Sequence, residues 1–245
     1  MRAGGRGARG TGIASWREAR TRVQKSERIR SALLAAAADV VGEVGYAEAS
    51  ISLITHRAGV AQGTFYNYFA SRQDILDQLL PAIGAQMLDH VRASARGGKT
   101  FAELEERSFV AFFSYLKKNP RFLRILNEAE SFAPEAYRQH FHVVSSRYLA
   151  FLRRSHGRGE FPRFTADELE VAVFMLMAAR SYLALRYASP GAGPEGIPQP
   201  VVRAYMKLVL HGLQDGRAVA RPAAADGRLR RAPSARTAGG SRPGR

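Results

Sequence analysis

Side chains that can bind nucleic acid gather in residues 58–75, which read AGVAQGTFYNYFASRQDI. Gln62 and Asn67 can hydrogen-bond to base edges in the major groove, where each base pair presents its own pattern of donors and acceptors. The hydroxyl groups of Thr64, Tyr66 and Tyr68 can bind phosphate oxygens, which fix the position of a protein on a duplex. This combination of residues predicts contact with double-stranded DNA.

The sequence around these residues predicts two short helices that present them. Ser50 can cap the first helix, and Gly59 can end it because glycine readily adopts the left-handed turn conformation. A second short helix is expected over about residues 62–69, held by Phe65 and Phe69, which share one face at a spacing of four. Two short helices joined by a tight turn are typical of a helix-turn-helix, whose second helix enters the major groove.

A third helix is expected to begin at Ser71. Ser71 with Asp74 three residues later forms a variant of the capping box. The first-turn amides of this helix, together with Arg72, would also face a phosphate. The alternative is a structural helical hairpin with buried aromatic rings, and it is disfavoured because residues 66–68, Tyr-Asn-Tyr, are too polar for a core.

Residues 33–80, LLAAAADVVGEVGYAEASISLITHRAGVAQGTFYNYFASRQDILDQLL, resemble the DNA-binding domain of the TetR/AcrR family of transcriptional regulators. The most specific part is AGVAQGTFYNYF, followed by the start of a further helix. Two positions depart from the usual pattern. Thr55 stands where alanine is usual, and Ala61 stands where a capping serine is frequent. The absence of that side-chain cap costs about 1 kcal/mol of helix stability. The resemblance implies base or groove contact for Gln62, Gly63 and Asn67, and phosphate contact for Thr64, Tyr66, Tyr68 and Arg72.

The rest of the chain reads as helices separated by capping and stop signals. Pro81 predicts a kink or a break in a long helix over residues 72–95. Thr165 with Glu168 is a capping pair, and the run SPGAGPEGIPQP separates the last two helices. We therefore predict an all-α fold of about nine helices, in which an N-terminal three-helix helix-turn-helix DNA-binding domain precedes a helical ligand-binding and dimerisation bundle.

Charge and composition divide the chain into four parts. Residues 1–28 and 216–245 carry +6 and +7 of the formal net charge of +16, in Gly-, Pro-, Ala- and Arg-rich sequence that cannot bury a core. These ends either add sequence-independent attraction to phosphate or are solvated ends without such a role. The expected parts are a basic disordered arm over 1–25, the DNA-binding domain over 26–80, the ligand-binding and dimerisation domain over 81–215 and a basic disordered tail over 216–245.

The helix after Thr165 is apolar nearly all round over residues 171–179. An isolated domain covers only one face of a helix, so such a helix is either central in its own domain or also meets a second subunit. With Tyr205, Leu208 and Leu213 of the last helix, it predicts a four-helix interface in a homodimer, and the family resemblance implies a dimer at the same place. Such a dimer reads two half-sites related by a two-fold axis, so a near-palindromic operator is expected.

A ligand cavity is expected among the helices of residues 101–187, which are rich in aromatic residues and methionines. A buried glutamate and arginine there would need each other or a ligand group. Arg180 facing the cavity would favour a carboxylate or acyl-type ligand, whereas Glu128 facing it would favour a cation. The candidate lining residues, each also a candidate for plain core, are Phe112, Phe113, Tyr115, Asn127, Glu128, Tyr137, Phe141, Phe174, Met177 and Arg180.

Other classes of protein are disfavoured by what the sequence lacks. The absence of cysteine excludes disulfides, thiolate metal sites and cysteine nucleophiles. The six histidines have no metal-site spacing, and there is no glycine-rich phosphate loop or nucleophile elbow, so no enzyme, catalytic residue, metal or cofactor is expected. The longest apolar run, VAVFMLMAA, is shorter than the about 20 residues a membrane helix needs, and no secretory signal is recognised, which predicts a cytoplasmic protein.

The favoured function is a sequence-specific transcriptional regulator. We expect a homodimeric repressor that leaves its operator when a small, largely apolar ligand shifts the helix after Ser71, although a corepressor-dependent or activating version would use the same parts. A non-specific or architectural DNA-binding protein driven by its basic tails is the alternative, and a ligand-free interaction module would keep the bundle without a cavity. Only the regulator would lose base discrimination when Gln62 or Asn67 is changed.

Overall fold

The computed structural model describes residues 22–160, 162–188 and 197–212. Within these ranges the secondary structure consists of nine α-helices, which confirms the predicted all-α class. The helices are α1 (Arg22–Val44), α2 (Ile51–Ala58), α3 (Gln62–Phe65), α4 (Arg72–Ser94), α5 (Phe101–Lys118), α6 (Phe122–Phe132), α7 (Pro134–Gly157), α8 (Ala166–Tyr187) and α9 (Gln199–His211). The predicted C-terminal tail, Leu213 and most of the predicted N-terminal arm lie outside the described residues, while residues 22–25 already belong to α1.

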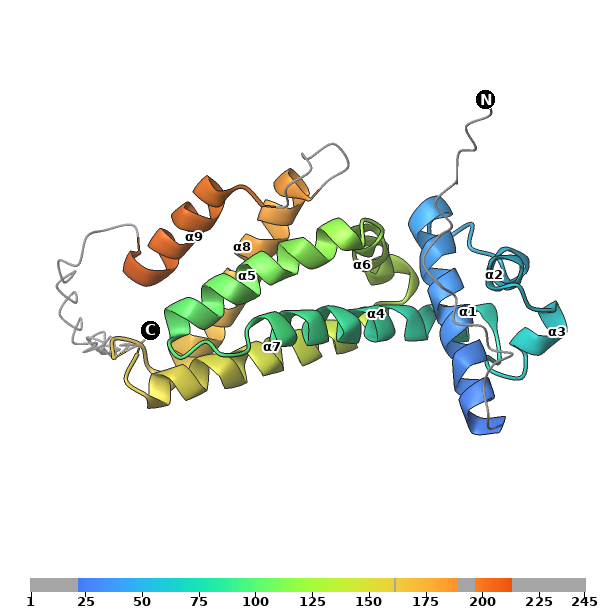
Figure 1. The fold of residues 1–245 in the computed structure, drawn as a ribbon, viewed down its shortest axis with the longest axis horizontal. Coiled ribbons are helices and arrows are strands. Elements are labelled where there is room, and N and C mark those ends of the chain that lie inside the picture. Colours follow the sequence, from blue (N-terminus) through green and yellow to red (C-terminus); the bar gives the residue numbers. More distant parts are fainter. Residues whose placement is uncertain (1–21, 161, 189–196, 213–245) are drawn as a thin grey trace, which may run out of the picture.

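The first three helices lie together at one end of the molecule, and α4 runs from them along the helical bundle (Figure 1). Local signals set their ends as predicted. The Ser50 side chain accepts a hydrogen bond from the Leu53 amide at the start of α2. Gly59 ends α2 in the left-handed conformation, with φ of 68°, which a residue with a Cβ rarely adopts. α2 and α3 therefore form the expected helix-turn-helix.

α3 is shorter than predicted. The regular helix ends at Phe65, and the segment expected to continue it to residue 69 is a tight turn. The amides of Asn67 and Tyr68 bond to carbonyls only three residues back, at 3.2 and 2.9 Å. Ala61 supplies no side-chain cap at the other end of the helix. The helix is held by tertiary packing, because Phe65 and Phe69 are 0% and 1% exposed.

One core joins the helix-turn-helix to the start of the bundle. Leu33 and Val41 of α1 pack with Ile54 of α2 and Phe65 of α3, and all four are completely buried. The same cluster includes residues from α4 and α6, namely Leu79, Leu80, Ile125 and Ala129. Because one set of apolar contacts covers both parts, the orientation of α1–α3 depends on where α4 and α6 lie.

α4 is a continuous helix from Arg72 to Ser94, with Pro81 inside it. The predicted break near residue 81 is therefore absent, although a proline cannot donate the helical hydrogen bond at its own position. The helix is closely packed on both sides: it contacts α5 and α7 along the bundle and α1 and α6 near the helix-turn-helix. α4 thus spans the distance between the two ends of the molecule (Figure 1).

The bundle beyond the helix-turn-helix consists of α5, α7, α8 and α9 together with α4, which lies between α5 and α7 (Figure 1). Its core is aromatic: Phe109 of α5 stacks on Tyr205 of α9 with ring centroids 3.9 Å apart, and Phe113 packs beside Phe109. The α8 helix begins with the predicted capping box of Thr165 and Glu168. Within the described residues no helix is long and apolar enough to span a membrane.

α8 buries little of its apolar surface within the chain. Val173 faces the core, but Phe174, Met175 and Tyr182 are 52%, 67% and 75% exposed. The sequence offered two readings of this helix, a central core element or a contact with a second subunit, and the first of them is wrong for its outer face. Leu208 of α9 is also exposed. The predicted partner Tyr205 instead points inward and is buried, so it does not belong to this surface.

Candidate nucleic-acid interface and effector cavity

The outer surface of α3 and the turn after it is polar. Gln62, Gly63 and Asn67 are exposed, Tyr66 is 55% exposed, and Thr64 is partly exposed. Figure 1 places this helix at the tip of the molecule, away from the bundle. A helix whose apolar side is fully buried and whose other side carries amide and hydroxyl groups can enter a major groove and hydrogen-bond to bases.

The fold does not require a glycine at position 63. A Cβ at this position would meet no atom within 4 Å, and its φ is not positive. Glycine in a helix costs about 1 kcal/mol relative to alanine. A glycine that the fold does not need, in the middle of the exposed polar surface, fits a position where the backbone must come close to another molecule.

Ser71 and Arg72 form hydrogen bonds with other groups of the protein and so fix the start of α4. The Ser71 hydroxyl accepts a hydrogen bond from the Asp74 amide at 3.1 Å. The Arg72 guanidinium donates to the carbonyls of Ala47 and Ala49, at 2.9 and 2.6 Å, and to that of Tyr46. Arg72 therefore fixes the loop between α1 and α2 against α4.

α6 is joined to the helix-turn-helix by a network of ion pairs and hydrogen bonds. Arg121 pairs with Asp39 and, at 2.6 Å, with Glu43, which also pairs with Arg57 of α2 at 2.6 Å. The Arg57 hydrogen bond lowers the pKa of Glu43 despite some desolvation. These surface pairs are individually weak, but together they connect α6, α1 and α2.

A second connection from α6 reaches the loop between α1 and α2. Glu128 accepts a hydrogen bond from the Tyr46 amide at 2.8 Å and from Arg124 at 2.7 Å. Desolvation opposes the charged form, but these two donors hold the pKa of Glu128 below its ordinary value. Arg124 also donates to the carbonyl of Glu43 at 2.6 Å. A movement of α6 would therefore be transmitted to the helix-turn-helix through the α1–α2 loop.

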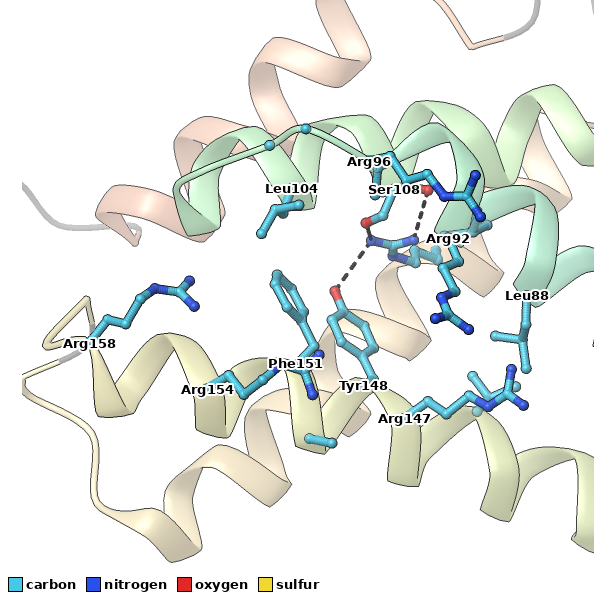
Figure 2. Close-up of a pocket in the computed structure, with 17 residues that line it drawn as sticks. Leu88, Arg92, Arg96, Leu104, Ser108, Arg147, Tyr148, Phe151, Arg154 and Arg158 are labelled. Carbon is cyan, nitrogen blue, oxygen red and sulfur yellow. Dashed lines mark hydrogen bonds between the residues drawn. The ribbon is translucent and has the colours of Figure 1, made fainter.

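A cavity of about 790 Å³ opens between α4, α5, α7 and α8, at the end of α4 remote from α3. Its volume lies in the range of small-molecule sites. Apolar side chains form part of the wall, namely Leu88, Val91, Leu104, Val144 and Phe151. Figure 2 shows Phe151 and Tyr148 reaching from α7 into the space below Leu104 and Ser108 of α5.

The floor of this cavity is a buried polar cluster. Arg180 of α8 donates to Glu105 of α5 at 2.7 Å and to the Ser108 hydroxyl at 2.9 Å. The hydroxyls of Tyr148 and Tyr205 donate to the same Glu105 oxygen, at 2.7 and 2.5 Å. Burial raises the pKa of both tyrosines, so both stay protonated and act as donors. Residues from α5, α7, α8 and α9 therefore meet at one carboxylate.

The mouth of the cavity is rich in arginine. Arg92, Arg96, Arg147 and Arg154 line it, are solvent-exposed, and have no carboxylate partner among the described residues. Arg158 also lines it but pairs with Glu160 at 2.5 Å. Figure 2 shows the arginines distributed around the opening rather than on one side. Four unpaired guanidinium groups around an opening favour a ligand with several negative charges.

Comparison with known proteins identifies the N-terminal part. The family model described as "Bacterial regulatory proteins, tetR family" matches residues 33–79. This range covers the C-terminal half of α1, all of α2 and α3, and the start of α4. Residues 33–79 therefore form a TetR-family DNA-binding domain. This confirms the resemblance of residues 33–80, and the matching family is one of regulatory proteins.

The relatives of this chain include regulators from Bacillus subtilis. It is 45% identical over 65 residues to the uncharacterized HTH-type transcriptional regulator YvdT, covering 26% of this chain and 31% of that protein. It is 34% identical over 71 residues to the fatty acid metabolism regulator protein, covering 29% and 37%. The matches thus span about a third of the length of these curated relatives.

A solved structure extends the likeness to the whole fold. The transcriptional regulator FadR from Bacillus subtilis, solved in complex with stearoyl-CoA, superimposes with a TM-score of 0.61 over 75% of this chain and 99% of that one, at 18% identity. At this identity the likeness shows the fold alone. It confirms a helical C-terminal domain behind the TetR-family helix-turn-helix.

Most of the ligand residues expected from the sequence lie away from the cavity. Phe113 and Tyr115 are buried core, with Tyr115 donating to the Ile83 carbonyl at 3.1 Å. Phe174 lies on the exposed face of α8, and Glu128 binds the α1–α2 loop. Phe112 and Met177 pack at the edges of core clusters, Tyr137 and Phe141 contact each other with tilted rings, and Asn127 is exposed. Of the ten, Arg180 lines the cavity.

The residues missed by sequence reasoning are Glu105, Ser108, Tyr148 and the arginines of the mouth. One local signal pointed to Glu105. It stands midway between Phe101 and Phe109 at a spacing of four, so it lies on the apolar face of α5. A carboxylate at such a position must be paired, and its partner Arg180 is 75 residues away. Among the described residues, no three His, Cys, Asp or Glu side chains gather as a possible metal site.

Proposed function

We propose that this TetR-family chain is a homodimeric, sequence-specific repressor whose operator is released by an acyl thioester of coenzyme A. The observation that carries the DNA-binding part is the polar outer surface of α3 over a completely buried Phe65. Gln62 and Asn67 are exposed there and can read bases, while Thr64, Tyr66 and Tyr68 can bind phosphates. Gly63 supports close approach of the backbone to the DNA, because the protein itself leaves space there.

Arg72 and Ser71 take an indirect part in this proposal. Both are occupied in holding the start of α4 and the α1–α2 loop. Their contribution to DNA binding is to fix the angle at which α3 leaves the bundle. The first-turn amides of α4 remain candidates for a phosphate contact, since they lie beside α3.

The homodimer is supported by the outer faces of α8 and α9. Phe174, Met175 and Tyr182 expose apolar surface on α8, as Leu208 and Leu210 do on α9. Large apolar side chains exposed on two helices are typical of a subunit interface. A two-fold pairing would form a four-helix contact and present two α3 helices to a near-palindromic operator.

The ligand part rests on the cavity and on a relative. The similar regulator FadR was solved in complex with stearoyl-CoA. In this chain, four unpaired arginines around the mouth suit the phosphates of coenzyme A, and the apolar wall of Leu88, Val91 and Phe151 suits part of an acyl group. The small, largely apolar ligand expected from the sequence is thereby replaced by an amphipathic anion.

The coupling of ligand to DNA would run through α4 and α6. α4 lines the cavity with Leu88, Val91 and Arg92, and its other end is fixed to the α1–α2 loop by Arg72. α6 holds the same loop through Glu128. A ligand that prefers one position of α4 would change the separation of the two α3 helices and lower operator affinity.

The test is binding of the full chain to the DNA upstream of its own coding region, compared with scrambled DNA at the same salt, by fluorescence anisotropy. We expect strong preference for the upstream DNA, its loss in Gln62→Ala, and release by at least one acyl thioester from a panel of plain and hydroxylated acyl-coenzyme A compounds, but not by coenzyme A alone. Equal affinity for both DNAs with a steep salt dependence would instead support the alternative, an architectural DNA-binding protein that uses its basic ends.

A further inference from the structure

The floor of the cavity is polar but close to neutral in charge. Arg180 is 12% exposed and pairs with Glu105, which is completely buried, at 2.7 Å. This pairing cancels the charge that a ligand would meet at the floor. The cluster is also incompletely satisfied, because Arg180 Nε and the second carboxylate oxygen of Glu105, Oε2, have no hydrogen-bond partner. Buried polar atoms without partners are uncommon and indicate where a further group can bind.

A plain alkyl chain is a poor occupant of such a floor. It would cover Arg180 without giving its unpartnered Nε a hydrogen bond, and burying a polar group in this way is unfavourable. A hydroxyl group fits better because it both accepts and donates. It can accept from Arg180, whose Nε has no partner, and donate to the hydroxyl oxygen of Ser108 or Tyr148, both of which line the cavity.

We propose that the cavity selects acyl thioesters whose acyl group carries a hydroxyl, and that Arg180 and Tyr148 are the specificity-determining residues that recognise it. This inference rests on the proposed function for the coenzyme A part of the ligand. The hydroxyl lies against Arg180, and the short apolar wall of Leu88, Val91 and Phe151 contacts the carbon chain. The ligand therefore differs in class from the saturated long-chain thioester bound by the similar FadR.

A carboxylate at the end of the acyl group is disfavoured by the same geometry. Arg180 already has Glu105 as its counter-ion, and Glu105 accepts hydrogen bonds from two tyrosines as well. A second carboxylate would meet a buried negative charge at short range, which is costly in a low-dielectric interior. The floor thus discriminates in favour of a neutral oxygen.

The mouth and the floor contribute to binding in different ways. Arg92, Arg147 and Arg154 at the mouth face the phosphates that every coenzyme A derivative carries, so they raise affinity without distinguishing acyl groups. Arg180 and Tyr148 contact only the acyl group, so they change affinity according to its chemistry. A mouth variant and a floor variant should therefore have separable effects.

The experiment is calorimetric titration of the full chain, without DNA, with matched thioesters: butyryl- and 3-hydroxybutyryl-coenzyme A, octanoyl- and 3-hydroxyoctanoyl-coenzyme A, succinyl-coenzyme A, and coenzyme A alone. In at least one matched pair we expect the hydroxyacyl member to bind roughly tenfold or more tightly than its unsubstituted partner. Succinyl-coenzyme A should bind more weakly than that hydroxyacyl ligand. Equal or tighter binding of the unsubstituted partner in both pairs, or tightest binding of the succinyl compound, would overturn the proposal.

Variants then assign the effect to residues. Tyr148→Phe keeps the ring and removes one hydroxyl, and the paired change Glu105→Gln with Arg180→Met removes both charges together so that neither is left buried alone. Both should abolish the preference for the hydroxyacyl ligand. Arg147→Ala should weaken all coenzyme A ligands by a similar factor and keep the preference. Arg153→Ala, on the same helix but outside the cavity, is the matched control and should change neither.

This design separates the inference from the proposed function. Because the titration uses no DNA, a failure of operator binding leaves the ligand preference measurable. If no coenzyme A derivative binds, both the ligand part of the proposed function and this inference are wrong. If coenzyme A derivatives bind without a hydroxyl preference, or with a preference that survives Tyr148→Phe and the paired variant, the specificity inference alone is wrong.

Discussion

Gly84 of α4 lies directly against the imidazole ring of His140 of α7. A Cβ built on Gly84 would stand 2.3 Å from His140 Nδ1 and 2.5 Å from Cε1. His140 is itself buried, and its ring packs edge-on against Phe122. The close approach of α4 to α7 therefore depends on the absence of a side chain at residue 84, and α4 is the helix that links the cavity to the helix-turn-helix.

The first prediction concerns this contact. Gly84→Ala should destabilise the fold by about 1–3 kcal/mol, because a methyl group has no space unless the two helices separate. Urea denaturation measures the effect. Gly63→Ala is the matched control, since a Cβ there meets no atom within 4 Å and stability should not fall. A second change, His140→Ala, should recover part of the loss in Gly84→Ala; unchanged instability would mean that the ring is not the obstacle.

The second prediction concerns pH. Desolvation lowers the pKa of His140 from 6.5 to about 4, so the folded chain keeps this imidazole neutral while the unfolded chain takes up a proton below pH 6.5. Stability attributable to His140 should thus be present above pH 6.5 and decrease as the pH falls toward 4, by up to about 3 kcal/mol. Denaturation midpoints across this range should show a shallower pH dependence in His140→Gln. An identical slope in both proteins would contradict the assignment.

The third prediction concerns Gly63 and DNA. Gly63→Ala should weaken operator binding by about tenfold or more while leaving the fold intact, because the added methyl group occupies space that the duplex needs. Anisotropy titration with operator DNA measures the affinity, and circular dichroism checks the helical content. Leu53→Ala is a suitable comparison because Leu53 is an exposed apolar residue on α2 rather than α3. Full operator affinity in Gly63→Ala would mean that the backbone at residue 63 does not come close to the DNA.

The fourth prediction concerns the dimer. Met175→Glu, which places a charge at the 67% exposed centre of the α8 surface, should shift the protein from dimer to monomer in sedimentation equilibrium. Operator affinity should fall as well, since a monomer reads only one half-site. Leu53→Glu, an equal change on α2, should leave the dimer intact. A dimer that survives Met175→Glu would exclude this face of α8 as its centre.

The fifth prediction concerns the link between α6 and the helix-turn-helix. Glu128→Gln keeps the shape of the side chain but removes the charge that accepts hydrogen bonds from the Tyr46 amide and Arg124. Ligand affinity should be unchanged, whereas the ratio of operator affinities with and without ligand should shrink, because α6 then holds the α1–α2 loop less firmly. Glu130→Gln, an exposed change on the same helix, provides the control. An unchanged ratio would place the coupling in α4 alone.

Local interactions account for what the sequence determined. Ser50, Gly59 and Thr165 set helix ends through bonds or backbone conformations within four residues, so their roles could be predicted without knowing the fold. The spacing of four between Phe65 and Phe69 likewise predicted which side of the segment faces inward, and both side chains are buried. The all-α class and the helix-turn-helix followed from these short-range patterns, and the family from the resemblance of residues 33–80 to a known DNA-binding domain. The length of α3 did not, because its end depends on packing after Phe65.

Only the tertiary structure decided what the polar groups of the bundle do. Glu128 and Arg180 both looked like cavity residues in sequence, but Glu128 binds the Tyr46 amide 82 positions away, and Arg180 finds Glu105 75 positions away. The arginines of the mouth come from α4, α7 and the segments beside them. Charged groups interact through space at distances set by helix packing, and no sequence period records which helices will meet. The sequence by itself therefore determined the DNA-binding end of this protein, and the fold alone determined the chemistry of its cavity.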